Sequence, residues 1–170
     1  GWSIATLEKA SRAAGFNEKL AELVFKNGVI SVIDYYFDGL DEQMKVATLK
    51  HKSKSVTENA KRAILERIKL LSKHKTLVTR TMAYMAMPQN TVHGMKFVWR
   101  TADVIWNDIV EDKSVDFNYY SKRTLLSGVY TSTIMFWVND DSKNLEETEK
   151  FLDRRLKDVG SIGKFLAKFK

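Results

Sequence analysis

The chain has 170 residues, a formal net charge of +7 and no cysteine. Its length suits one domain with a substantial core, and the lack of cysteine excludes disulfides, thiolate catalysis and cysteine-ligated zinc. One proline and eight glycines favour an all-α protein. No apolar run reaches the roughly 18 residues that span a bilayer, and the first residues lack the basic-then-apolar pattern of an export signal. We therefore expect neither a membrane-spanning helix nor export.

The charge is unevenly distributed along the chain. Residues 44–80 carry eleven Lys and Arg against two Glu, a net charge of +9. Residues 101–117 carry five Asp and Glu against one Lys, a net charge of −4. This asymmetry predicts separate faces for separate partners, and ordinary solvated helix faces are the alternative.

The first 40 residues have the outline of a helix-turn-helix. A short helical pattern over residues 6–14 is followed by Gly15, which permits a tight turn, and by Asn17, a favoured N-cap. A second helix is expected over residues 18–27. Helix, glycine-bearing turn and helix together are typical of the DNA-binding motif.

A third helix is expected over residues 30–37, ending near Gly39. Residues 44–54 are basic and compatible with a helix but only weakly periodic. Ser55 and Glu58 have the spacing of a capping box, which predicts the start of a long helix running to about residue 71.

The second half of the chain predicts three further long helices. A mostly apolar helix over residues 76–87 is stopped by Pro88, and residues 91–110 carry a nearly regular apolar stripe. Residues 116–137 repeat apolar side chains at helical three-four spacing, with Asp116 as the expected cap. After a break at residues 139–142, the last long helix is expected to be interrupted at Gly160.

The last residues, 160–170, predict a short basic amphipathic helix. Its apolar side chains follow i, i+3, i+4, i+7 spacing, with lysines between them, as in helices that lie at a membrane interface. The expected membrane-contacting residues are Ile162, Lys164, Phe165, Leu166, Lys168 and Phe169. Docking of this helix on its own bundle or on a second copy is the alternative.

The sequence offers no catalytic constellation. The three histidines, His51, His74 and His93, lack the Glu-x-x-His units of a di-iron or zinc bundle. Neither a Gly-x-Ser-x-Gly elbow nor a glycine-rich phosphate loop is present. We therefore expect a non-enzyme without a metal or catalytic cofactor.

Residues 116–133 carry the most specific pattern in the chain, Asp-Phe-Asn-x-Tyr-x-Lys-Arg-x-x-Leu-x-x-Val-Tyr-x-x-Thr. It resembles the signature of an accessory family of coenzyme Q (ubiquinone) biosynthesis, the ninth in the usual naming series. The resemblance extends from about Tyr84 to Leu156 and takes in Met87-Pro88-x-Asn90 and Asp140-x-Ser142. Members of that family are lipid-binding proteins with a TetR-like fold.

The resemblance implies a single TetR-like domain over residues 1–170. Its parts would be a helix-turn-helix-like region over 1–40, a lipid-binding bundle over 55–159 and the membrane-contacting helix over 160–170. The first region also resembles the second and third helices of TetR-type regulators. The stretch between Gly1 and the helix expected over residues 6–14 is too short for the first helix of such regulators.

The apolar faces of the three long helices are, by periodicity alone, typical of a plain core. The resemblance instead implies that they enclose an isoprenoid, a quinone or a phospholipid. The expected lipid-contacting residues are Met82, Met85, Trp99, Ala102, Ile105, Tyr120, Leu126, Val129, Tyr130, Thr133, Phe136 and Trp137.

Trp106 is set apart because it lies among polar residues, including Asp103 and Asp108. The resemblance implies a surface patch that docks the di-iron demethoxyubiquinone hydroxylase, and an exposed Trp is a typical hot spot. Inward packing of Trp106 beside Ile105 is the alternative. The expected partner-contacting residues are Met87, Asn90, Asp103, Trp106, Asp116 and Asn118.

The resemblance also implies a homodimer formed by the C-terminal helices. It places the protein peripherally on a membrane, on the matrix side of the mitochondrial inner membrane or the bacterial cytoplasmic face. A TetR-type transcriptional regulator with a lipophilic effector is the second reading, and a structural dimer module the third. Residues 18–26 carry two Glu against two Lys and no Arg. DNA binding is therefore less favoured, because phosphate contacts supply most of the affinity for DNA.

Overall fold

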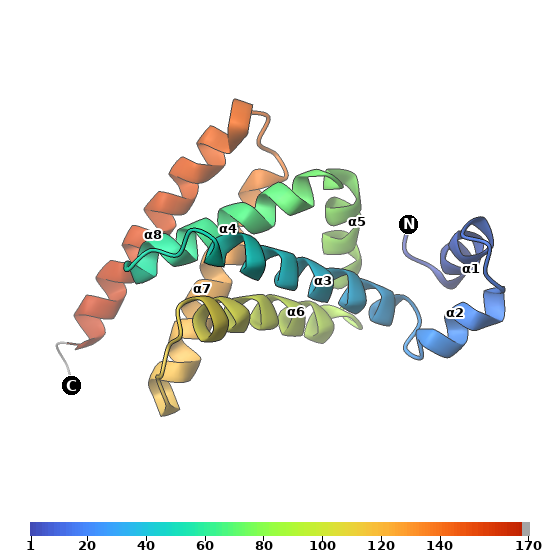
Figure 1. The fold of residues 1–170 in the computed structure, drawn as a ribbon, viewed down its shortest axis with the longest axis horizontal. Helices are drawn as coiled ribbons and strands as arrows, with labels where there is room; N and C mark the ends of the chain where they lie inside the picture. The colour runs from blue at the N-terminus through green and yellow to red at the C-terminus, as the bar shows by residue number, and fades with distance from the viewer. Residues whose placement is uncertain (168–170) are drawn as a thin grey trace.

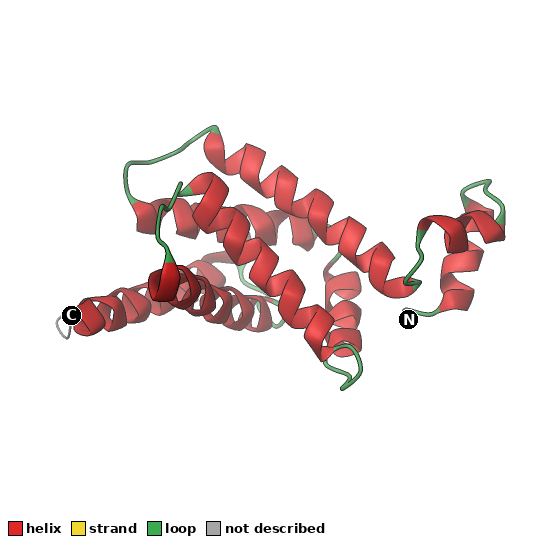
Figure 2. Cartoon of the chain, turned by 90° about the horizontal axis from the view of Figure 1, so that it is seen from below, coloured by secondary structure: helices red, strands yellow, loops and turns green. Residues whose placement is uncertain are grey.

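The computed structural model describes the backbone of residues 1–167 and their side chains, except those of residues 18, 19, 116 and 161–167. Within that range all regular structure is helical, so the all-α prediction is confirmed (Figure 2). None of the described helices is long and apolar enough to cross a membrane. The elements are α1 (Ile4–Ala13), α2 (Glu18–Val24), α3 (Val29–Leu49), α4 (Val56–Ser72), α5 (Lys75–Met85), α6 (Thr91–Val104), the π-helical turn η1 (Ile105–Ile109), α7 (Asp116–Trp137), the 3₁₀ turn η2 (Lys143–Leu145) and α8 (Glu146–Ala167).

Helices α3 to α8 form one bundle, and the α1–α2 hairpin lies beyond the start of α3 (Figure 1). The core is built mainly from one face each of α4, η1 and α7, where apolar side chains recur every three or four residues. Its fully or almost fully buried members are Leu40, Met44, Ala60, Ala63, Ile64, Ile68, Leu71, Val78, Ala102, Ile105, Ile109, Leu126, Val129, Tyr130, Ile134, Trp137 and Leu152.

Helix α3 is longer than the sequence predicted. It passes through Gly39 without a break and continues to Leu49, so the expected end near that glycine is wrong. Leu40, Met44 and Thr48 recur every four residues and are buried, which continues the inward face of the helix past the glycine. Burial of this face outweighs the roughly 1 kcal/mol that an interior glycine costs a helix.

Helix α8 likewise continues through Gly160 to Ala167, so the expected interruption there is wrong. The expected N-cap of α4 is confirmed, because the hydroxyl of Ser55 accepts from the backbone N–H of Glu58 at 3.3 Å. Helix α7 begins at Asp116 itself, and Val115 occupies the N-cap position. The sequence analysis therefore placed the N-cap of this helix one residue too far along the chain.

The basic and acidic segments do not form wholly separate faces. Lys45 of α3 lies 3.4 Å from Asp108, and Lys52 lies 2.9 Å from Glu111. Much of the remaining basic excess is also paired, as in the contacts of Lys61 with two carboxylates of α8. The expectation of separate charged faces is wrong at these positions, because the two segments fold against each other.

The predicted helix-turn-helix outline is present as the α1–α2 hairpin. Gly15 supplies the turn with a φ of 81°, a left-handed conformation that glycine adopts without strain. Trp2 ties the hairpin to the bundle, because its indole N–H donates to the hydroxyl of Thr81 at 2.9 Å. No residue of α1 is buried, so the core depends little on this hairpin.

Asp140 organises the connection from α7 to α8. Its carboxylate accepts from the backbone N–H of Ser142 at 2.8 Å and from the backbone N–H of Thr148 at 3.0 Å. The Thr148 hydroxyl also donates to it. Burial alone would raise the pKa of Asp140, but the hydrogen bonds from Thr148 and Ser142 outweigh burial and lower it to about 2. The Asp140-x-Ser142 motif therefore caps the start of α8.

Replacing Asp140 with alanine should lower the free energy of unfolding by about 1 kcal/mol at neutral pH, the usual cost of losing a cap. Since the folded pKa lies below the ordinary value of 3.8, the stabilisation is complete above about pH 4. It should be lost as the pH falls towards 2. Urea unfolding of both proteins across this range measures the difference. Asp141→Ala is the matched control, because its side chain is 99% exposed, and equal effects of the two changes would contradict the capping role.

Candidate functional site at the crossing of α6 and α7

Helix α6 approaches α5 closely at one end and crosses α7 near the other. A Cβ added to Gly94 would lie 3.1 Å from the Cβ of Met85, so the glycine permits the close approach of α5 and α6. Asn90 is buried in the turn between the two helices, where its side-chain amide donates to the Tyr84 carbonyl oxygen at 2.9 Å. These contacts fix the direction in which α6 leaves α5.

Trp99, Asp103 and Trp106 of α6 and η1 each contact α7. The Trp99 and Tyr120 rings lie 6.3 Å apart between centroids. The Asp103 carboxylate accepts from the Tyr119 hydroxyl at 3.2 Å, and the Trp106 indole N–H donates to the Lys122 carbonyl oxygen at 3.1 Å. Trp99, Asp103 and Trp106 stand at i, i+4, i+7 spacing, so a single helical stripe makes all three contacts.

The sequence predicted that the apolar stripe of residues 91–110 is α-helical to its end. This prediction is wrong for the last residues. It becomes π-helical at η1, where the Val110 N–H donates to the Ile105 carbonyl oxygen at 2.9 Å. Ile105 and Ile109 both remain buried, while Trp106 between them reaches α7. Single π-helical turns of this kind occur frequently at functional sites.

The centre of the crossing is a buried cation. The Arg123 side chain is 1% exposed and pairs with Asp103, and its Nη1 also lies 3.9 Å from Asp112. Burial would raise the pKa of Asp112, but hydrogen bonds from Lys122 and Ser114 outweigh it and lower that pKa. The Lys122 ammonium in turn lies 5.4 Å from the centre of the Trp106 ring.

The predicted lipid-contacting residues divide into three groups by burial. Ala102, Ile105, Leu126, Val129, Tyr130, Thr133 and Trp137 are buried in the core. Met82, Met85, Trp99 and Phe136 are half-buried, and Tyr120 is 62% exposed. The half-buried and exposed members are therefore the ones that a ligand reaches without opening the bundle.

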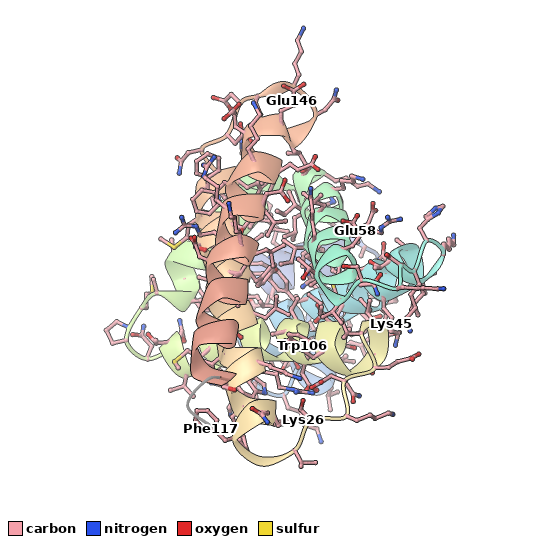
Figure 3. The ribbon with its side chains drawn as sticks, turned by 90° about the vertical axis from the view of Figure 1, so that its left-hand side faces the viewer. Lys26, Lys45, Glu58, Trp106, Phe117 and Glu146 are labelled. Carbon is pink, nitrogen blue, oxygen red and sulfur yellow. The ribbon has the colours of Figure 1, made fainter. Side chains whose placement is uncertain are left out.

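The predicted partner-contacting residues do not form one open patch. Asn90 is buried, Met87 is exposed, and Asn118 lies near the exposed start of α7. Trp106, labelled in Figure 3, is half-buried and packs against the core, which lies between the two alternatives raised by the sequence. The side chain of Asp116 is outside the described residues.

The predicted membrane-contacting side chains also lie outside the described residues. The α8 backbone is helical as far as Ala167, a range that includes positions 162, 164, 165 and 166, and Lys168 and Phe169 follow it. The expectation for residues 160–170 stays a prediction.

An exposed apolar surface that the sequence analysis did not single out runs from α6 to the start of α7. We call it the aromatic surface, and it consists of Val92, Met95, Trp99, Phe117 and Tyr120. Val92 and Met95 are 61% and 68% exposed, although Met95 belongs to the apolar stripe expected over residues 91–110. Phe117 is 68% exposed and lies at the beginning of α7 (Figure 3). Periodicity identified part of this face but could not show that the side chains described by the structure leave it uncovered.

A shallow depression lies along the middle of α7, between that helix and α8. It has a volume of about 270 Å³, is largely open to solvent, and is lined by Thr124, Leu125, Gly128, Val129, Ser132, Arg155, Asp158 and Val159. Among the side chains that the structure describes, no three His, Asp or Glu residues come together as metal ligands.

Replacing Asp103 with alanine should lower the free energy of unfolding by about 2 kcal/mol, because it removes the nearest counterion of a buried guanidinium. Breaking a buried ion pair often costs more than this. The expected loss of stability is smaller here because Asp112 and the Tyr119 carbonyl oxygen remain near Arg123. Asp108→Ala is the matched control. Its longer contact with Lys45 is partly exposed and should contribute less than about 1 kcal/mol. Equal losses in urea unfolding would contradict the central place given to Arg123.

Residues 91–163, which include α6, η1 and α7, match the family model COQ9. The chain is 25% identical over 171 residues to the rat ubiquinone biosynthesis protein COQ9, mitochondrial. It is 24% identical over 165 residues to the Schizosaccharomyces pombe protein of the same description. These alignments cover 96% and 95% of this chain, and 54% and 64% of the two relatives. The chain therefore spans about half the length of the rat relative and somewhat more of the yeast one.

The fold is similar to that of a TetR transcriptional regulator from Nitrosomonas europaea, with a TM-score of 0.70. The two chains are 18% identical, and the match covers 91% of this chain and 85% of the regulator. This likeness confirms the predicted TetR-like fold. The resemblance that the signature helix indicated is also confirmed: almost the whole chain is similar to the COQ9 ubiquinone biosynthesis proteins, and its fold is TetR-like.

Proposed function

We propose that this chain is a non-catalytic accessory protein of ubiquinone biosynthesis. It binds an isoprenoid, quinone or phospholipid at a membrane surface and presents quinone intermediates to demethoxyubiquinone hydroxylase. The observation that carries the proposal is the position of the aromatic surface, which lies within the segment that matches the COQ9 family model and adjoins the α6–α7 crossing.

The chemistry of the aromatic surface suits a lipid tail. Its members are largely apolar, and four of them are more than half exposed, which is typical of an interaction site. Met95 has a flexible thioether that adapts to irregular apolar ligands. Trp99 and Tyr120 have amphipathic rings that suit the boundary between an apolar tail and water.

The order of residues along α6 supports a presenting role. The stripe that begins in the aromatic surface at Trp99 continues to Asp103 and Trp106, which lie at the polar crossing. A lipid tail held at the Trp99 end of the stripe would therefore place the ligand beside the surface on which the hydroxylase is proposed to dock. Catalysis is assigned to that di-iron partner.

Membrane contact is proposed for residues 160–170, at the end of α8. The rat and yeast relatives are named mitochondrial proteins, which favours the matrix side of the inner membrane; the bacterial cytoplasmic face is the alternative. We further propose a homodimer through α7 and α8, supported by the depression between them and by Met135, which is 56% exposed on α7.

A DNA-binding regulator is the alternative function, and the TetR-like fold is its support. The described side chains of α2 give it little further help. Leu20, Leu23 and Val24 are exposed and apolar, and Glu22 beside them is acidic. Such a surface offers few phosphate contacts.

The lipid proposal predicts that Met95→Glu and Tyr120→Glu, introduced together, strip the purified protein of lipid. Each change places a charge where about 1.5 kcal/mol of apolar contact is expected, so occupancy should fall by at least about 10-fold. Organic extraction followed by mass spectrometry measures the quinone and phospholipid bound per chain.

Val46→Glu is the control, since it puts the same charge on an exposed apolar side chain of α3, away from the aromatic surface. Trp106→Ala separates the two proposed roles: it should weaken capture of the hydroxylase and leave the lipid content unchanged. Wild-type protein without extractable lipid, or a double variant that retains it, would contradict the proposal.

The membrane proposal predicts that deletion of residues 161–170 abolishes sedimentation with vesicles of phosphatidylcholine and phosphatidylserine. The truncated chain should stay folded, because the core lies upstream of this segment. Phe165→Glu and Phe169→Glu should have nearly the same effect. The lysines should add about 1 kcal/mol each for anionic lipid. Raised salt should therefore weaken binding without removing it. A truncated chain that sediments as fully as the intact one would show that this helix packs on protein.

A further inference from the structure

Arg67, in the middle of α4, is a buried cation with unused donors. Its side chain is fully buried; its Nη1 lies 2.9 Å from the Asp41 carboxylate and donates to the Phe37 carbonyl oxygen at 3.2 Å. The Nε and Nη2 groups find no acceptor among the residues that the structure describes. Buried donors of this kind are almost always satisfied in folded proteins. The N–H groups of Nε and Nη2 are thus available to an acceptor from outside the chain.

The buried hydroxyl of Tyr36, on α3, also has no hydrogen-bond partner among the described residues. It belongs to the same neighbourhood as Arg67, because Phe37 contacts both. The Tyr36 and Phe37 ring centroids lie 5.5 Å apart, and the Arg67 Cζ lies 5.4 Å from the Phe37 centroid. Burial raises the pKa of Tyr36, while the charge of Arg67 partly opposes this rise. The phenol is therefore protonated at neutral pH and can donate a hydrogen bond.

The positive charges of Arg67 and Arg100 already have carboxylate partners. Asp41 lies 2.9 Å from Arg67 and accepts a hydrogen bond from Arg100, which also pairs with Asp34. Two guanidinium groups therefore face three carboxylates, since the Asp38 carboxylate lies 3.9 Å from Arg100. An anion placed beside Arg67 would add an unbalanced negative charge. A neutral oxygen satisfies the free donors without this cost.

Aromatic rings lie beside this group of donors. Phe37 stacks on Phe97 of α6 at 6.3 Å, and Tyr36 meets the His74 ring edge-on at 6.5 Å. His74 is exposed and Tyr36 is half-buried. Such a lining favours a planar, apolar ring that carries the acceptor oxygen.

We propose that Arg67 and Tyr36 form a polar subsite between α3 and α4 for a neutral oxygen on a planar ring, of the quinone or phenol class. This inference rests on the proposed function, which supplies a ligand with such a ring.

The experiment titrates the full chain with a soluble benzoquinone that has no isoprenoid tail. Binding is followed through the Nε–Hε resonance of Arg67, with inorganic phosphate at equal ionic strength as the parallel probe. The quinone should shift this resonance, and phosphate should not. Tyr36→Phe removes only the hydroxyl and should weaken quinone binding about five-fold, the usual effect of one hydrogen bond. Arg67→Lys keeps the charge for Asp41 but loses the fork of donors, and should weaken binding further.

Tyr35→Phe is the matched control, because it makes the same change at the neighbouring tyrosine, which is 75% exposed. Circular dichroism establishes that each variant is folded. An Arg67 resonance that does not respond to quinone would mean that water alone satisfies the donors and would overturn the subsite. A response to phosphate alone would overturn the neutral acceptor. Quinone binding that neither variant weakens would overturn the subsite and leave the proposed function standing, whereas the absence of any bound lipid or quinone would defeat both.

Discussion

The arrangement of the bundle depends on one buried carboxylate, that of Asp41. It forms an ion pair with Arg67 of α4 at 2.9 Å, and it accepts hydrogen bonds from Thr101 of α6 at 2.9 Å and from Arg100 of α6 at 3.1 Å. Asp41 itself lies on α3, so one side chain joins three helices. Apolar contacts alone tolerate sliding between helices, but a buried charge must meet its partners in one register or lose several kcal/mol. The network therefore determines how α6 lies on α3 and α4.

The candidate site follows from that placement. With Thr101 and Ala102 held against the core, the opposite stripe of α6 is turned towards α7 and solvent. Trp99 and Trp106 lie on this stripe and meet α7 on either side of Asp103. The polar crossing and the aromatic surface are thus two parts of one helix face. The buried charges on the other face of α6 determine its orientation.

Much of this organisation could be predicted from the sequence, because helical periodicity is a local property. The all-α class, the signature helix over 116–137 and the cap at Ser55 are examples. The errors arose where distant contacts overrode local preference. Gly39 lies inside a helix because the residues after it are buried by α4 and η1, and the basic residues after Gly39 meet carboxylates that are remote in sequence. The exposure of Val92 and Met95 could not be predicted either, since a stripe does not reveal whether another helix covers it.

The α1–α2 hairpin stands energetically apart from the rest of the molecule. No residue of α1 is buried, and the hydrogen bond from Trp2 to Thr81 is its tie to α5. Substitutions on its surface therefore cost the bundle little stability. Over evolutionary time such a hairpin is free to exchange one binding specificity for another, or to lose binding altogether, while the interior stays under constraint. A fold shared by a transcriptional regulator and a chain similar to biosynthesis proteins is the outcome expected when one small part of a chain diverges faster than the rest.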